Sequence, residues 1–434
     1  MAVASRPRTD SPRSLAARAA GLALALALLP APVRAQLIDR YFPQGVPGYG
    51  AEPGVTVQSR AREAYDPPGV RLGGIILRPT LSTALGTTSN ATGQPAGRPS
   101  ALAQTSGSLL AGTNWGRHAI GGYLGIDDQR VVSASAQSGT AWTAALGGTM
   151  EIGRDQLALG AAHLDLFQSA RALNSLALDR PGRFRVNNAR AAYTWRSGRL
   201  SIAPGLSLTD TSYDDVFIGG RRVLQRYRDR LATEGNVTTR WQLAPLRDLV
   251  LDLRAVGFTF ARREPGQPSR NATAVALLAG IDYATDAVWR VRALAGVQHR
   301  SFADPSLRAI TGPMAEASLI WSPSGLTTVT ATLSRRIEDA AELSALTYAF
   351  TGGRLVVDHE LQRNLLLAAS IDLQRADTQQ RGGHETLLGL GLGATWLMNR
   401  QLRTTASWDW TTRRRSDGIA VQEGIALLRL RVAM

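Results

Sequence analysis

Apolar and polar residues alternate one by one, in segment after segment, from about Gly74 to the end of the chain. Between residues 230 and 243, one parity carries Leu231, Val237 and Trp241, while the other carries only polar or small side chains. Successive side chains of a β-strand point to opposite faces, so each such segment has one face suited to an apolar environment and one suited to water. Outside residues 19–29, no apolar run approaches the ~20 residues that a membrane-spanning helix needs. The pattern therefore predicts strands with two unlike faces.

The connectors between these segments are alternately short and long. The short ones have the composition of tight turns and cover residues 114–117, 152–155, 196–199, 244–247, 285–286, 322–325, 360–363 and 398–400. The long, polar ones cover residues 86–103, 127–139, 171–183, 210–225, 262–270, 301–308, 338–344, 376–383 and 413–420. A soluble β-sandwich also has alternating strands, but strict alternation of turns and loops is typical of an outer-membrane barrel, with short periplasmic turns and long extracellular loops. The sequence predicts an all-β, up-and-down antiparallel transmembrane barrel of roughly 18 strands, too wide to be filled by its own side chains.

The N-terminal region has the features of an export signal. Four arginines precede an apolar stretch at residues 19–29, and the tripeptide Val33-Arg34-Ala35 follows, so we expect a signal peptide over residues 1–35 with cleavage after Ala35. Residues 36–73 are rich in Pro, Gly and charge, and we expect an irregular periplasmic extension there. Residues 74–434 then form the barrel, located in the outer membrane after Sec-type export.

Two residue types are missing, and their absence excludes several kinds of chemistry. The chain has no cysteine, which excludes disulfides, thiol catalysis and cysteine-bound metals. It also has no lysine, which excludes a phosphate-loop lysine and a Schiff base. The five histidines are far apart and form no metal-binding motif, and we expect no cofactor, no metal site and no catalytic site. The formal charge of +15 would allow a nucleic-acid partner, but the arginines are spread along the strands rather than clustered, so none is expected.

Arginines on the polar parities carry the one functional signal with a mechanism. The residues expected to line the lumen are Arg240, Arg254, Arg290, Arg292, Arg336 and Arg431, with Glu234, Asp252 and Asp409 among them. Such an interior is positive on balance while remaining internally paired, and a positive field favours the entry of anionic solutes. The alternative is that these charges mainly pair with one another and order the water of the lumen.

Residues 62–79, with the sequence REAYDPPGVRLGGIILRP, resemble the entry into the barrel of the putative β-barrel porin type 2 family. Residues 226–254, 321–327, 334–339 and 358–365 are also similar to this family, so the resemblance extends from about Tyr65 to the end. Two features depart from the family pattern: Gly86-Thr87-Thr88-Ser89-Asn90 replaces a Tyr-Asp-Asp-Asn-like stretch, and Met434 replaces the usual terminal aromatic residue. The resemblance implies an outer-membrane barrel of a kind often encoded beside genes for capsule or exopolysaccharide production, and it implies no catalytic residues.

Two functions remain open at this point. The first is a porin-like conduit, for anionic solutes or for an acidic exopolysaccharide during export. The second is a non-conducting structural or assembly barrel that binds surface polysaccharide through its loops. The expected partners are outer-membrane lipid, lipopolysaccharide, the barrel assembly machinery and, for the export function, components of exopolysaccharide export. Whether the extension that follows the signal peptide enters the lumen would discriminate between the two functions.

Overall fold

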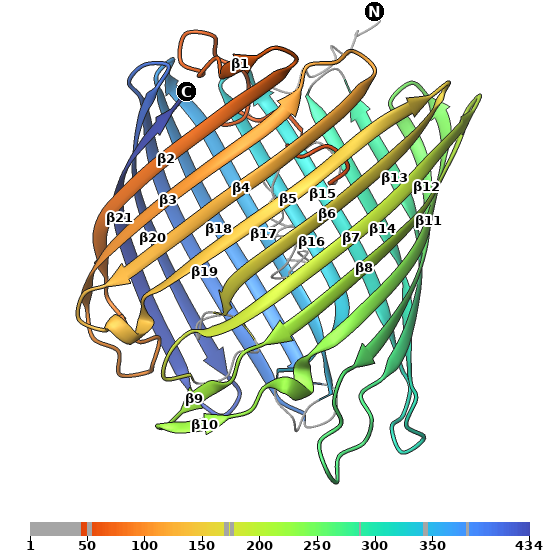
Figure 1. Cartoon of the computed structure of the whole chain (residues 1–434), viewed down its shortest axis with the longest axis vertical. Coiled ribbons are helices and arrows are strands. Elements are labelled where there is room, and N and C mark those ends of the chain that lie inside the picture. The colour runs from red at the N-terminus through yellow and green to blue at the C-terminus, as the bar shows by residue number, and fades with distance from the viewer. Residues whose placement is uncertain are drawn as a thin grey trace, which may run out of the picture.

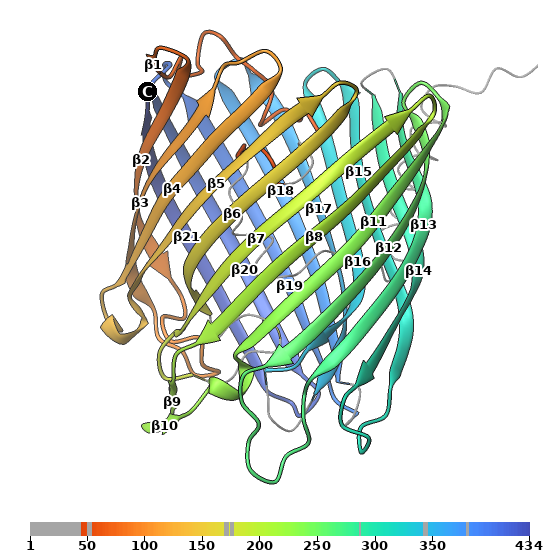
Figure 2. The ribbon, with the colours of Figure 1, turned by 45° about the vertical axis from the view of Figure 1, so that its right-hand side comes forward.

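A computed structural model describes residues 45–49, 54–168, 173, 178–285, 288–341, 346–378 and 382–434. Eighteen long strands form one closed antiparallel barrel, in which each strand pairs with its sequence neighbours and β21 pairs with β2. The barrel and the tilt of its strands are visible in Figure 1 and, from a second direction, in Figure 2. The predicted fold class and strand number are confirmed. Within the described residues, no helix is long and apolar enough to cross a membrane.

The elements follow one another with little else between them. The barrel strands are β2 (Ile75–Thr88), β3 (Ser100–Thr113), β4 (His118–Val131), β5 (Gly139–Ile152), β6 (Asp155–Gln168), β7 (Gly182–Ser197), β8 (Leu200–Tyr213), β11 (Arg230–Ala244), β12 (Arg247–Phe260), β13 (Ala272–Thr285), β14 (Trp289–Phe302), β15 (Ile310–Ser324), β16 (Thr327–Asp339), β17 (Thr347–Gln362), β18 (Leu365–Thr378), β19 (His384–Leu397), β20 (Leu402–Arg415) and β21 (Ala420–Ala433). The short elements are β1 (Val70–Leu72), β9 (Val216–Ile218), β10 (Arg221–Val223) and the 3-10 turns η1 (Ser135–Gln137) and η2 (Arg226–Arg228).

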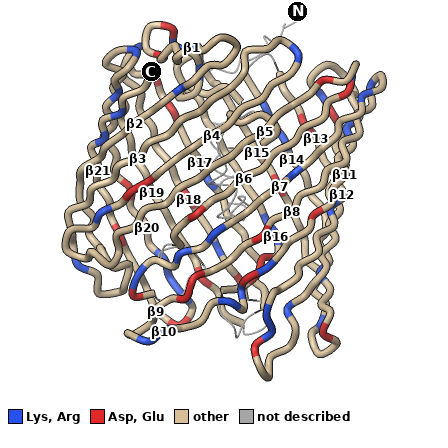
Figure 3. The backbone as a smooth tube through the Cα atoms, viewed as in Figure 1, with Lys and Arg blue, Asp and Glu red and all other residues tan. Residues whose placement is uncertain are grey.

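The two ends of the barrel differ as the connectors predict. The end with the tight turns is called the turn rim here, and the end with the long connectors is called the loop rim. Gly153 and Gly198 make the turns β5–β6 and β7–β8 with positive φ angles of 63° and 56°, which glycine adopts without steric cost. The C-terminal end of β21 and the short strand β1 both lie at the turn rim (Figure 1). Charged residues of both signs gather at the loop rim around β9 and β10 (Figure 3).

The strands are longer than the membrane requires. Most have 14 residues, such as β8, which corresponds to about 46 Å along a strand and about 33 Å of height at a ~45° tilt, against an apolar band of ~25 Å. On β8 the outward residues from Leu200 to Leu208 are apolar, and Asp210 follows them toward the loop rim. The strands therefore extend beyond the apolar band at the loop rim. This extension shortens the expected long connectors: the first covers residues 89–99 instead of 86–103.

The inward and outward faces follow the predicted parities. Leu231, Val237 and Trp241 of β11 are exposed on the outer surface. Their neighbours on the other parity face the lumen, where Thr238 donates a hydrogen bond to Asp252 of β12. At the turn rim, the outward rings of Trp289 and Trp321 stack 5.0 Å apart, as expected for an aromatic girdle at the membrane interface.

Candidate functional site: the lumen and its two inserts

The residues expected to line the lumen lie on the inward parity, in separate regions of the barrel wall. Glu234, Arg240, Asp252 and Arg254 lie on β11 and β12, Arg290 and Arg292 on β14, Arg336 on β16, Asp409 on β20 and Arg431 on β21. The structure does not bring them together into one cluster. Their positions follow directly from the two-residue period of the strands.

Several of these charges are neutralised by close partners. Arg254 contacts Asp252 through Nη2 at 2.5 Å and Glu316 of β15 through Nη1 at 2.6 Å. Arg336 contacts Glu338 at 2.5 Å. In the described part of the chain, by contrast, Arg240, Arg290 and Arg431 have no carboxylate within 4.0 Å. The positive character of the wall therefore depends on a subset of its arginines.

The end of β16 separates from its neighbour β15 in the barrel wall, while β17 stays paired with β18 as far as Tyr348. The pairing of β15 with β16 stops at Ala315 and Arg335, whereas β16 and β17 remain paired to Asp339 and Thr347. Strand β15 itself stays beside β14 up to Ile310. Residues 336–341 and 346–350 therefore have one free edge, along β16, and we call these residues the inner hairpin.

Contacts with β14 and β15 show that the inner hairpin folds into the lumen. The backbone N–H of Ile337 donates a hydrogen bond of 2.9 Å to Oε1 of Gln298, which points inward from β14. The Cδ1 atom of Ile337 lies 3.4 Å from the position that a Cβ would take at Gly312, on the inner face of β15. Thr347 and Ala349, which would face lipid if the hairpin continued the wall, are buried. The hairpin therefore crosses the inner face of β15 and narrows the lumen toward the loop rim.

A buried charge cluster fixes the tip of this hairpin. Asp339 contacts Nη2 of Arg300 and Nη1 of Arg230, each at 2.5 Å. Arg300 is 1% exposed, and its guanidinium lies 4.5 Å from the ring centroid of Phe258. Arg270 donates a hydrogen bond of 3.0 Å to the carbonyl of Ala340 at the same tip. One carboxylate thus anchors the hairpin to two guanidinium groups of the wall.

The connectors of the loop rim hold the hairpin from the other side. Tyr227 of η2 donates a hydrogen bond of 2.7 Å to the carbonyl of Ala341. Leu173 of the β6–β7 connector packs in one buried cluster with Tyr348 and Phe350 of the hairpin. The β6–β7 connector is itself bonded to its neighbours, since Gln137 donates to the carbonyl of Asp179 at 2.9 Å. The loop rim is therefore an interlinked layer rather than a set of separate loops.

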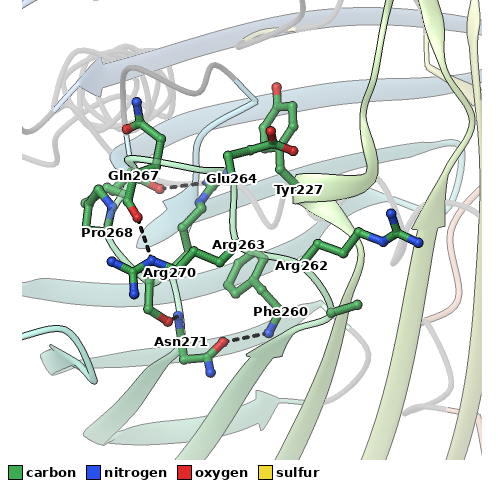
Figure 4. A pocket seen from close by; sticks show the side chains of 12 residues that line it. Tyr227, Phe260, Arg262, Arg263, Glu264, Gln267, Pro268, Arg270 and Asn271 are labelled. Atoms are coloured by element: carbon green, nitrogen blue, oxygen red, sulfur yellow. Dashed lines mark hydrogen bonds between the residues drawn. The ribbon is translucent and has the colours of Figure 1, made fainter.

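A pocket opens in this layer beside Arg270 (Figure 4). Its wall is the β12–β13 connector, where Arg263 donates to the carbonyl of Gln267 at 2.7 Å and Asn271 accepts a hydrogen bond from the backbone of Phe260 at 2.8 Å. Burial lowers the pKa of Arg270, against the opposing effect of Asp339. The pocket thus lies directly against the anchor of the inner hairpin.

A second insert enters from the turn rim. Residues 45–49 lie on the inner wall of β3 to β7, where Val46 is buried and the Tyr49 hydroxyl donates a hydrogen bond of 3.2 Å to Asn188. Burial raises the pKa of Tyr49 to about 12, while Arg190, 5.5 Å from its ring centroid, acts in the opposite direction.

Residues 54–68 continue this insert on the opposite side of the barrel. The N–H of Val57 donates to Thr328 of β16 at 3.1 Å. Arg60 and Arg62 both pair with Glu360 of β17, and Asp66 pairs with Arg403 of β20 at 2.7 Å. Hydrogen bonds and ion pairs thus hold Val57, Arg60, Arg62 and Asp66 against β16, β17 and β20. The periplasmic position of residues 36–73 stays a prediction. The predicted signal peptide lies outside the described residues.

Two other polar groups lie away from the lumen. His163 of β6 is on the outward parity, bonded to Asn187 at 2.7 Å and 4.6 Å from the ring centroid of Trp142. Asp215 of the β8–β11 connector pairs with Arg222 at 2.5 Å. Among the described residues, no group of three or more His, Asp or Glu side chains could hold a metal ion.

The chain is similar to several known proteins. A model of the family described as "Putative beta-barrel porin 2" matches residues 63–432. One similar solved structure is Pseudomonas aeruginosa OpdK with vanillate, at 11% identity and a TM-score of 0.44, with 82% of this chain and 99% of that chain covered. Another is P. aeruginosa OccK2 in complex with glucuronate, at 12% identity and a TM-score of 0.44, with 83% of this chain and 98% of that chain covered. A third is the FrpB iron transporter of Neisseria meningitidis, at 10% identity and a TM-score of 0.44, with 78% of this chain and 63% of that chain covered. No curated protein matches the chain.

Proposed function

The chain belongs to the putative beta-barrel porin 2 family, and from this premise we propose that it is an outer-membrane conduit for small anionic solutes. The observation that carries the proposal is the inner wall: an 18-strand barrel is too wide for its own side chains to fill, and its inward parity keeps arginines without acidic partners. Guanidinium groups that are not neutralised raise the local concentration of anions in a water-filled lumen.

The two inserts limit the size of what can pass. The inner hairpin narrows the lumen toward the loop rim, and residues 45–49 and 54–68 lie against the inner wall. Export of a bulky acidic exopolysaccharide would require at least one insert to move. We therefore favour small solutes over a polymer as the transported species.

The same inserts support a second candidate, a structural barrel with a closed lumen. The interlinked layer at the loop rim, with Tyr227 bonded to Ala341 and Leu173 packed on Phe350, is the observation that favours it. In this case the loops would bind surface polysaccharide and no ions would pass. Conductance separates the two functions directly.

The experiment is a planar-bilayer recording of the purified protein. A conduit should show discrete conductance steps and a reversal potential that indicates anion preference, weaker at high salt because the Debye length falls from ~10 Å at 0.1 M to ~3 Å at 1 M. Replacing Arg290 and Arg292 together with Gln should lower the anion preference without changing folding. Arg375→Gln is the matched control, because Arg375 lies on the outward parity in an exposed pair with Asp377. Cation selectivity at low salt would contradict the anionic-solute proposal, and a complete lack of conductance would favour the structural barrel.

A further inference from the structure

Three arginines lie close together on the inner wall where β20, β21 and β2 meet. Arg403 of β20 and Arg431 of β21 are directly opposite each other, and Arg429 lies two residues further along the same face. Directly opposed side chains have Cβ atoms ~5 Å apart, and like charges in such a pair repel. The protein therefore keeps two guanidinium groups together at a repulsive cost that a bound anion would remove.

The acids near this group leave positive charge uncompensated. Arg403 donates to Asp66 at 2.7 Å and to the carbonyl of Tyr65 at 3.2 Å, so one of its partners comes from the N-terminal insert. Asp127 of β4 is a further acid that interacts with Arg429 electrostatically. Arg431 has no hydrogen bond and no carboxylate partner in the described part of the chain, and its side chain is exposed to the lumen. Arg431 is therefore available to a solute.

Arg429 connects the arginines to a row of hydroxyl and amide groups. It donates to Gln104 at 2.9 Å and to Ser82 at 3.4 Å. Ser82, directly opposite Arg431, is bonded to Ser106 at 2.6 Å.

The polar row continues along β2, β3 and β4. Thr80 is bonded to Ser108 at 2.7 Å, and Gln104 is bonded to Gln129 at 3.3 Å. Each hydroxyl pair uses only part of its capacity, since a hydroxyl group can donate one hydrogen bond and accept two.

The neighbouring wall has the opposite character. On β6 and β7, the inward residues Leu164, Phe184 and Val186 form a buried apolar cluster. These side chains are buried and closed to a solute, whereas the wall beside Arg431 offers hydroxyl and amide groups. The polar groups beside the arginines therefore match a solute with a polar body.

The geometry points to a binding site for hydroxylated carboxylic acids on the inner wall of β20, β21, β2 and β3. The guanidinium of Arg431, with those of Arg403 and Arg429, holds the carboxylate through charge-assisted hydrogen bonds. The Ser and Gln rows of β2 and β3 bond the hydroxyl groups. This inference names the solute class of the proposed conduit and in that sense rests on it, but binding can be measured without conduction.

The test is calorimetric titration of the purified protein in detergent with gluconate, with propionate and sorbitol as controls that carry only the charge or only the hydroxyl groups. Gluconate should bind at least about tenfold more tightly than either control, because it alone forms both the charge-assisted hydrogen bonds of the carboxylate and the hydrogen bonds of the hydroxyl groups. Arg431→Gln should weaken gluconate binding about tenfold or more. The matched control Arg375→Gln removes an outward arginine of β18 from an exposed pair with Asp377 and should leave binding unchanged.

A second variant tests the hydroxyl row separately. Ser82→Ala with Ser106→Ala should reduce the preference for gluconate over propionate while propionate binding stays the same. Arg429→Gln provides an alternative if Arg431→Gln does not fold. Equal binding of gluconate and propionate, or no effect of either arginine variant, would overturn the site even if the barrel conducts. Tight gluconate binding by a barrel without conductance would support the site and contradict the conduit.

Discussion

Removing the charge of Asp339 should release the inner hairpin. The substitution Asp339→Asn keeps the size of the side chain but leaves Arg300, which is 1% exposed, and the partly buried Arg230 without their shared carboxylate. Breaking a buried ion pair from one side costs about 3 to 5 kcal/mol, because a charge remains buried without compensation. Since ~1.4 kcal/mol corresponds to a factor of ten, the ratio of hairpin in place to hairpin released should fall by a factor of about 150 or more.

Single-channel recording in planar bilayers can detect this change. The variant should show a larger conductance state, or frequent transitions to one, because the hairpin no longer narrows the lumen toward the loop rim. The control is Asp377→Asn, which breaks an exposed pair with Arg375 on the outer surface of β18. Exposed pairs contribute at most ~1 kcal/mol, so the control should conduct like the unmodified protein.

A double variant tests the electrostatic argument. In Asp339→Asn with Arg300→Gln, the most deeply buried uncompensated charge is also removed, so part of the original conductance should return. Resistance to detergent before boiling would show that both variants keep a closed barrel. An unchanged distribution of conductance in Asp339→Asn, with the barrel intact, would refute the view that this cluster holds the hairpin in the lumen.

Three further predictions concern the barrel wall and the loop rim. Val237→Arg, on the outward face of β11, should lower the free energy of unfolding of the inserted protein by ~2 to 4 kcal/mol, measured by urea unfolding from lipid vesicles. Thr238→Arg, on the inward face, should have a small effect. Equal effects would mean that the assigned faces are wrong. A hydrogen bond from Arg222 lowers the pKa of Asp215 in the folded protein. The ionised Asp215 therefore stabilises the fold fully above its pKa in the unfolded chain, ~3.9, and this stabilisation is lost only as the pH falls through the lower pKa of the folded protein. Hydrogen exchange of the β9–β10 hairpin should therefore remain slow at pH 5, and early loss of protection would contradict the assignment. The protein in detergent should give a β-rich circular dichroism spectrum and change its electrophoretic mobility only on boiling, and a helical spectrum would be incompatible with the fold.

Most of the barrel could be predicted because the relevant signals are local. The two-residue period fixes which side chains of β11 face lipid, and turn residues such as Gly153 and Gly198 mark where the chain reverses. The sequence predicts the ends of the strands less accurately, because the polar residues outside the apolar band still belong to the strands. Asp210, for example, was assigned to a connector, yet it pairs with Asn187 of β7.

The inner hairpin could not be predicted because its anchors are far away in the sequence. Residues 327–339 keep the regular alternation of a wall strand, and nothing in that segment indicates that Asp339 meets Arg300 or that Ala341 meets Tyr227. One signal was present on the neighbouring strand. Pro313 of β15 lacks an N–H group, and proline in a strand is typical of an unpaired edge. The edge lies at this position, because the pairing of β15 with β16 begins only at Ala315, two residues after Pro313.

The N-terminal insert and the inner hairpin are each held by a carboxylate that pairs with two arginines, and these ion pairs affect the charge of the lumen. Glu360 binds Arg60 and Arg62 of the insert, and Asp339 of the hairpin binds Arg230 and Arg300 of the wall. In both places one carboxylate serves two guanidinium groups, so these acids cannot neutralise arginines elsewhere on the wall. A count of charged residues on the inward parity therefore describes the lumen poorly, because anchoring decides which arginines remain available. Any movement of an insert changes both the width of the lumen and its field, and a solute that replaced Asp66 at Arg403 would couple its own binding to the position of the N-terminal insert.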